Sequence, residues 1–196
     1  MTSTSSATAE RWSEHLVTVA GPGVDAGVSA IRVLGPSLGR AFSAVVAGTD
    51  AGTTPEIRPG DREVGLWWAV QDEGIDIEPL IAEPTDGSLW PVPDVGLEVW
   101  TEVELCGLHA LWWIARRRSS PTLVRRIDDL RKWHMENTQP DNATFRPWAL
   151  QVFALDEDPE SQLYAETLLH NAMITGPEPL SAWILQDAAR ALRGET

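Results

Sequence analysis

Cysteine is almost absent from this chain of 196 residues, which contains Cys106 and no other. A single cysteine cannot form an intrachain disulfide, and it excludes a zinc site built from several thiolates. The chain also has no uninterrupted apolar run long enough to cross a bilayer, and its first residues lack the features of a secretory signal. These absences predict a soluble protein of the reducing cytoplasm that has no membrane partner.

Positive charge is scarce as well. Lysine and arginine together number 15 against 29 aspartates and glutamates, which gives a net charge of −14 and a pI near 4.6. Nucleic-acid binding requires a positive face that displaces counterions, so this balance argues against a nucleic-acid partner. The hydrophobic fraction of 43% is sufficient for a core and is typical of a folded domain.

Tyrosine and phenylalanine are rare, but tryptophan occurs ten times. Such a tryptophan-rich, acidic chain either fills its core with indole rings or lines a groove in which some of them stack on a ligand. Signals for β-strands are also weak, because alternating apolar and polar residues are missing. Apolar residues recur instead at helical spacing, which predicts an all-α fold.

The pattern predicts about eight to ten helices, packed as antiparallel hairpins around a central buried helix at 97–118. This helix is apolar on almost every side between Val103 and Ala115, as expected for a helix that is surrounded by others. We therefore expect one compact helical domain rather than several.

Domain boundaries follow from composition. Residues 1–8 are small and polar and predict a disordered tail, so that the domain covers 9–196. The helical pattern is weaker over 9–83 and clearer over 97–194. The Pro- and Gly-rich loop between them, 84–96, is of a length that is usually functional or wraps the surface.

The densest run of polar side chains covers residues 133–148, between two apolar helices. Acid–base catalysis needs a carboxyl or imidazole group whose pKa is shifted by its surroundings, and the candidates here are Glu136, Asp141 and His134. Side chains that could bind a neutral polar substrate are Trp133, Asn137, Gln139, Asn142, Arg146 and Trp148. The alternative is a structural turn whose polar side chains form hydrogen bonds within the turn, because Asp and Asn side chains bond to nearby backbone groups.

A second candidate lies on the central helix, where Glu102, Cys106, His109 and Trp113 are spaced to share one face. Glu102 and His109 would form a buried polar face, either structural or an acid–base pair. His109 and His134 could also contribute to a metal site, but no paired-histidine motif is present, and we predict neither a metal nor another cofactor. Cys106 is expected to be a buried apolar residue rather than a nucleophile.

Basic residues are concentrated between Arg116 and Lys132, which contain 7 of the 15 in the chain. They form either a solvated face paired with local acids or a docking face for a protein partner or a second copy of this chain. The residues of that docking face would be Arg116, Arg117, Arg118, Arg125 and Arg126.

No phosphate-binding loop, dinucleotide fingerprint or nucleophile elbow occurs in the sequence. This favours a binding or self-assembling module, although it leaves open whether the protein is an enzyme. One alternative is an enzyme that acts on a carbohydrate-like or other neutral polar substrate at the 134–146 loop. The other is a metal-dependent helical enzyme that uses His109 and His134.

Overall fold

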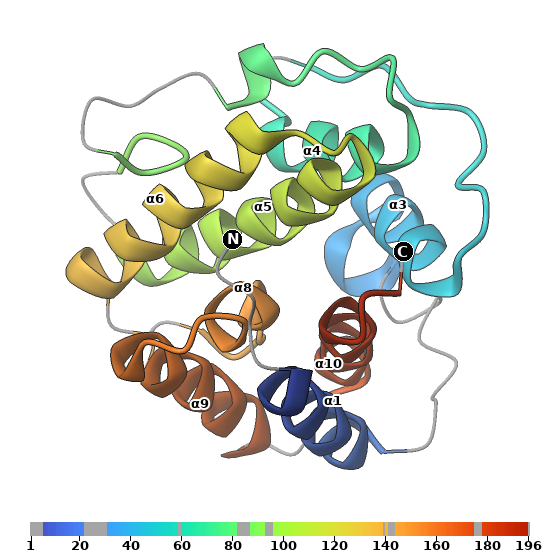
Figure 1. The fold of residues 1–196 in the computed structure, drawn as a ribbon. Helices are drawn as coiled ribbons and strands as arrows, with labels where there is room; N and C mark the ends of the chain where they lie inside the picture. Colours follow the sequence, from blue (N-terminus) through green and yellow to red (C-terminus); the bar gives the residue numbers. More distant parts are fainter. Residues whose placement is uncertain are drawn as a thin grey trace.

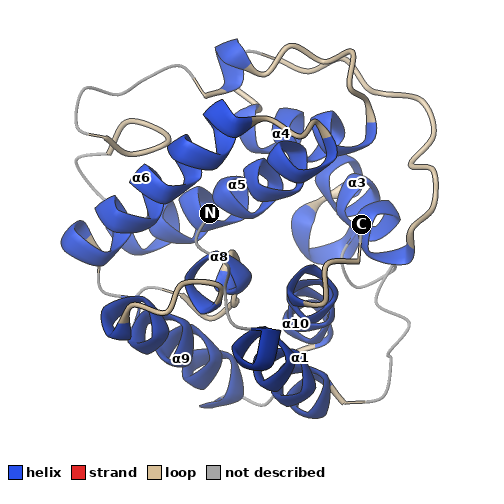
Figure 2. Cartoon of the chain, in the orientation of Figure 1, coloured by secondary structure: helices blue, strands red, loops and turns tan. Residues whose placement is uncertain are grey.

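The structure is a computed structural model, and it describes residues 6–21, 31–58, 60–81, 87–92, 96–138, 140, 144–174 and 178–195. All regular structure in these ranges is helical, as the colouring of Figure 2 shows. The predicted all-α class is therefore confirmed. No helix within them combines the length and the apolar character that crossing a bilayer would require.

The helix α5 (Leu97–Arg117) occupies the centre of the molecule, with α4 (Arg62–Gln71) and α6 (Pro121–Asn137) packed against it (Figure 1). Every side chain from Glu104 to Ala115 is buried. A helix that is apolar on all sides gains free energy only when other helices surround it, because burial removes apolar surface from water. The predicted central helix is confirmed, and it ends within a residue of the predicted boundary.

The helices α1 (Ser6–Ala20) and α10 (Pro179–Leu192) lie side by side (Figure 1), and Arg193 Nη1 donates to Ser13 Oγ at 2.8 Å. Because α1 begins at Ser6, residues 6–8 are helical, and their assignment to a disordered tail was wrong. Two of the four residues of this first turn are alanines, which have the highest helix propensity, and α1 as a whole packs against α10. Residues 1–5 lie outside the described ranges.

The other described elements complete the core around α5. They are α3 (Pro36–Ala47), the short 3-10 helix η1 (Glu78–Leu80), α8 (Leu150–Ala154) and α9 (Pro159–Ile174). Of the ten tryptophans, eight are buried, so the indole rings chiefly fill the core.

Three arginines of the predicted docking face bind backbone carbonyls inside the molecule. Arg117 Nη1 donates to Val70 O at 2.9 Å, and Arg118 Nη2 donates to three carbonyls around the same end of α4. Arg126 Nη2 donates to Ser88 O at 2.6 Å. Since the last carbonyls of a helix have no partner within it, the guanidinium groups of Arg117 and Arg118 cap α4, whereas Arg126 binds the segment at 87–88. The basic cluster is therefore not one uniform surface.

In the described part of the predicted 84–96 loop, residues 88–90 are buried in the core, whereas residues 91 and 92 are exposed. The Glu104 carboxylate accepts the backbone N–H of Leu89 and, at 3.0 Å, that of Trp90. The Trp90 ring packs against Gly107, where a Cβ atom would stand 2.3 Å from the ring. This segment is held by a buried carboxylate and by a glycine that admits an indole ring.

Candidate functional site

A pocket of about 430 Å³ lies beside the first half of α5, against α3, α4 and residues 145–148. Its polar side chains are Glu63 from α4, Glu102 from α5 and Arg146. Its apolar lining includes Val33, Leu38, Val99, Val103, Phe145 and Trp148. We name it the acidic pocket.

Three apolar side chains of this lining are exposed, since Val33 is 45%, Val99 72% and Phe145 68% accessible to solvent. Trp148, by contrast, is fully buried. The pocket thus combines a buried indole ring with exposed apolar side chains and a few polar groups. This composition is typical of sites that bind small molecules.

Two carboxylates share the guanidinium group of Arg146. Its Nη1 binds Glu102 Oε1, and its Nε donates to Glu178 Oε1 at 2.9 Å. Glu63 is a third carboxyl group in the same surroundings, and no salt bridge of the described residues joins it to a cation. Three carboxyl groups therefore meet at this pocket, and the salt bridges of Arg146 account for two of them.

Burial raises the pKa of Glu63 above its ordinary value. A hydrogen bond from Cys106 opposes this shift, repulsion from Glu102 adds to it, and the more distant Arg146 opposes it. The result is a carboxyl group that resists ionisation at a position where a ligand can reach it. Shifted carboxyl groups in clefts are characteristic of functional sites.

Cys106 connects this carboxyl group to the core. Trp67 Nε1 donates to Cys106 Sγ at 3.2 Å, and the thiol donates in turn to Glu63. Burial and the neighbouring Glu63 raise the pKa of the Cys106 thiol well above its ordinary value. The thiol thus stays protonated and buried, and it orients Glu63 rather than acting as a nucleophile.

Further along the same face of α5, His109 and Trp113 share one buried carboxylate. His109 Nε2 donates to Asp187 Oδ2 at 3.0 Å, and Trp113 Nε1 donates to the same oxygen at 2.7 Å. The backbone N–H of Ala149 donates to His109 Nδ1 at 3.2 Å, so the ring hydrogen of His109 is on Nε2. These side chains are fully buried, and His109 and Glu102 do not form an acid–base pair with each other.

Of the three predicted catalytic residues, the structure describes His134 and Glu136, and these two lie in different surroundings. His134 is fully buried, its Nδ1 lies 3.3 Å from Thr138 Oγ1, and burial lowers its pKa to about 3. Thr138 Oγ1 lies 2.6 Å from Tyr164 OH, so His134 belongs to a structural contact between α6 and α9. Glu136 is exposed on α6, and Asp141 lies outside the described residues.

The predicted binding residues separate into two groups. Arg146 and Trp148 line the acidic pocket, whereas Asn137 donates to Trp133 O at 2.9 Å at the surface. Trp133 is half-buried and packs edge-on against Trp100, with 5.7 Å between ring centroids. Gln139 and Asn142 lie outside the described residues. The predicted polar run therefore lies in two places, because its first residues form the end of α6 and its last residues line the acidic pocket.

Glu63 and Asp187 were missed as functional candidates, although spacing could have singled out both. Glu63 precedes the buried Trp67 by four residues on α4, so the two side chains share a face. Asp187 lies on the apolar face of α10, three residues after the buried Ile184. An acid on the inner face of a helix needs a partner or a function.

The metal hypothesis gains no support from the part of the chain that the structure describes. No three histidine, cysteine, aspartate or glutamate side chains gather there as a metal site. His109 is bound to Asp187 and His134 faces Thr138, so the two histidines have separate partners.

Comparisons with protein-family models, with curated proteins and with solved structures find no match for this chain. The functional proposal below therefore depends on the geometry and chemistry of the site alone.

Proposed function

We propose that this protein is a ligand-binding helical protein whose acidic pocket takes up a small organic cation, an amine with an apolar body. The observation that carries the proposal is the surplus of carboxyl groups in the pocket. Glu102 and Glu178 share the single guanidinium group of Arg146, and Glu63 is left without a cation.

An ionised Glu63 in apolar surroundings needs a counterion, because desolvation disfavours the charged form of a carboxyl group. A ligand ammonium group would supply that counterion at Glu63. Its apolar body would lie against Val103, Phe145 and Trp148, where burial of apolar surface adds to the affinity. An anion would be repelled, and a neutral ligand would leave Glu63 protonated.

Calorimetric titration with phenylpropylamine tests this proposal, with phenylpropanol as the neutral comparison. We expect the amine to bind more tightly and to release a proton from Glu63, which is measured in buffers of different ionisation enthalpy. Its affinity should rise with pH through the raised pKa of Glu63, because only the ionised carboxylate pairs with an ammonium group.

The matched variants are Glu63→Gln and Glu56→Gln, since Glu56 is exposed and does not line the pocket. Loss of a hydrogen-bonded charge partner should weaken amine binding about tenfold or more in Glu63→Gln, together with the proton release. The Glu56→Gln variant should bind as the wild type does. Equal binding of amine and alcohol, or unchanged binding by Glu63→Gln, would contradict the proposal.

A second candidate function is catalysis in the same pocket, with Glu63 as a general acid acting on a neutral polar substrate. It is favoured by the presence of two carboxyl groups, of which only Glu102 is paired with a cation. A general acid acts in its protonated form, so activity would fall as the pH rises through the pKa of Glu63. Cation binding rises over the same range, and this opposite sign separates the two functions.

We also propose a reducing, cytoplasmic location. It is supported by the single thiol, Cys106, which is buried and hydrogen-bonded to Trp67 and Glu63. Imaging of the tagged protein in cells tests the location directly, and export from the cytoplasm would contradict it.

A further inference from the structure

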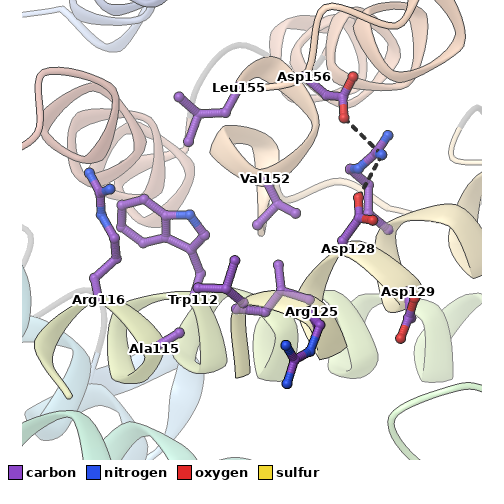
Figure 3. A pocket seen from close by; sticks show the side chains of 12 residues that line it. Trp112, Ala115, Arg116, Arg125, Asp128, Asp129, Val152, Leu155 and Asp156 are labelled. Atoms are coloured by element: carbon purple, nitrogen blue, oxygen red, sulfur yellow. Dashed lines mark hydrogen bonds and ion pairs between the residues drawn. The ribbon is translucent and has the colours of Figure 1, made fainter. Parts of the chain in front are cut away.

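A second pocket, of about 470 Å³, lies at the other end of α5, between the last turns of that helix, α6 and α8 (Figure 3). Its apolar lining consists of Trp112, Ala115, Val124, Ile127, Val152 and Leu155. Trp112 is 5% exposed, so its ring belongs to the core while one part of it faces the pocket. We name it the arginine pocket.

The acids of this pocket lie at the end away from Trp112, where Figure 3 shows Asp128, Asp129 and Asp156. Arg131 Nη2 binds Asp128 Oδ1 at 2.9 Å and Asp156 Oδ2 at 2.8 Å. Lys132 Nζ adds a bond of 2.7 Å to Asp128 Oδ2. Two of the three carboxylates are thus already paired with cations.

Arg116 and Arg125 differ from Arg131, because neither makes a salt bridge with an acid of the described residues. The guanidinium carbon of Arg116 lies 4.9 Å from the centroid of the Trp112 ring, and its buried Nε has no hydrogen-bond partner. Stacking occupies the face of a guanidinium group and leaves its N–H edges for an acceptor. Arg125 is exposed, and it makes no salt bridge with Asp129, one turn further along α6, among the described residues.

We propose that the arginine pocket binds a small amphipathic carboxylate, whose anionic group pairs with Arg125 and is attracted by the charge of Arg116, and whose apolar body lies on Trp112. Carboxylates fit the N–H edges of a guanidinium group, and such charge-assisted bonds are the stronger ones in proteins. The apolar body would lie between Trp112 and Val152, which face the same space in Figure 3. This site is separate from the acidic pocket and does not depend on its function.

Nuclear magnetic resonance of the ¹⁵N-labelled protein tests the proposal, with phenylpropionate as the probe and phenylpropanol as its neutral analogue. The indole N–H signal of Trp112 is identified by its loss in Trp112→Phe. We expect phenylpropionate to shift this signal at millimolar concentrations, and phenylpropanol to bind at least several-fold more weakly.

Arg125→Gln is the decisive variant, because an exposed side chain with no described partner can be replaced without cost to the fold. It should weaken phenylpropionate binding about tenfold, as expected for the loss of a charge-assisted hydrogen bond. Arg58→Gln is the control for general charge, since Arg58 is exposed and outside the pocket. It should leave the affinity unchanged.

Three results would overturn the proposal. The first is the absence of a shift at Trp112, and the second is equal affinity for the carboxylate and the alcohol. The third is an equal effect of Arg125→Gln and Arg58→Gln, which would mean that phenylpropionate responds to the net charge of the protein and not to this pocket.

Discussion

The acidic pocket and the arginine pocket are similar in volume, about 430 and 470 Å³, and they flank the two ends of α5. In each, one guanidinium group is shared by two carboxylates: Arg146 by Glu102 and Glu178, and Arg131 by Asp128 and Asp156. What remains without a salt bridge differs, because the first pocket keeps one carboxyl group, whereas the second keeps the guanidinium groups of Arg116 and Arg125 beside the carboxylate of Asp129. The salt bridges within each pocket, and not the net charge of −14 of the whole chain, therefore determine which charged groups remain for a ligand.

The direction of α5 agrees with this distribution of charge. Glu102 lies in the first turns of the helix, and Arg116 lies in its last turn. A helix dipole stabilises negative groups near its N-terminus and positive groups near its C-terminus. The dipole of α5 thus favours the side-chain charges found near its two ends, and it is these side chains, not the dipole, that would attract ligands of opposite sign.

The largest effect is expected from the buried contact on α5 between the pockets. Asp187→Ala leaves the N–H groups of His109 and Trp113 unpaired in the core, which should cost about 3–5 kcal/mol of unfolding free energy. Denaturant unfolding measures this loss, and Asp187→Asn, which keeps one acceptor oxygen, should lose less. A cost below about 1 kcal/mol for the alanine variant would mean that this contact contributes little to the stability of the core between the two pockets.

The next largest effect is a decrease of the unfolding free energy in acid. This decrease limits the pH range over which Glu63 can be titrated in the folded protein. The pKa of His134 is about 3 in the folded protein and 6.5 ordinarily, so between these values only the unfolded chain binds the proton. Unfolding free energy should therefore fall by about 1.4 kcal/mol per pH unit as the pH drops through this range. His134→Gln should show a shallower decline, whereas the exposed His170→Gln should retain the steep one.

A smaller effect is a gain in stability from Glu63→Gln. Because the pKa of Glu63 is raised in the folded protein, its ionisation disfavours folding above that pKa and has no such effect below the ordinary value of 4.5. The variant should therefore melt at a higher temperature than the wild type at neutral pH. This gain should vanish in acid. A lower melting temperature at every pH would instead make Glu63 a structural residue.

The smallest expected effect is a difference in salt dependence between the two ligands. The net charge of −14 attracts an amine and repels a carboxylate at long range, and salt screens both effects. Raising the salt concentration should weaken phenylpropylamine binding about two- to threefold more than phenylpropionate binding. Parallel titrations at low and physiological salt measure the difference. If salt changes the two affinities to the same extent, the net charge of the protein does not distinguish the two ligands at long range.

The fold was largely predictable because apolar spacing is a local property. The central helix follows from an apolar run between Val103 and Ala115, and its C-terminal arginines mark where it ends. The role of residues 87–92 was not predictable in this way. It depends on Glu104 and Gly107, which the chain brings to Trp90 only when the helices have packed.

The site was predicted in part, for the same reason. Spacing placed Glu102, Cys106, His109 and Trp113 on one face of a helix, and the structure agrees. It gave no information on which helices would face them. Glu102 meets Arg146 across 44 residues of sequence, and His109 meets a carboxylate 78 residues away.

The distance in sequence between His109 and Asp187 also has a consequence for synthesis. The ribosome adds His109 of α5 to the chain 78 residues before it adds Asp187, whose carboxylate binds this histidine in the core. During this interval α5 carries two N–H donors, those of His109 and Trp113, without the acceptor that they have in the folded core. Folding of the core is therefore expected to wait for α10, and the nascent chain exposes α5 to chaperones until then.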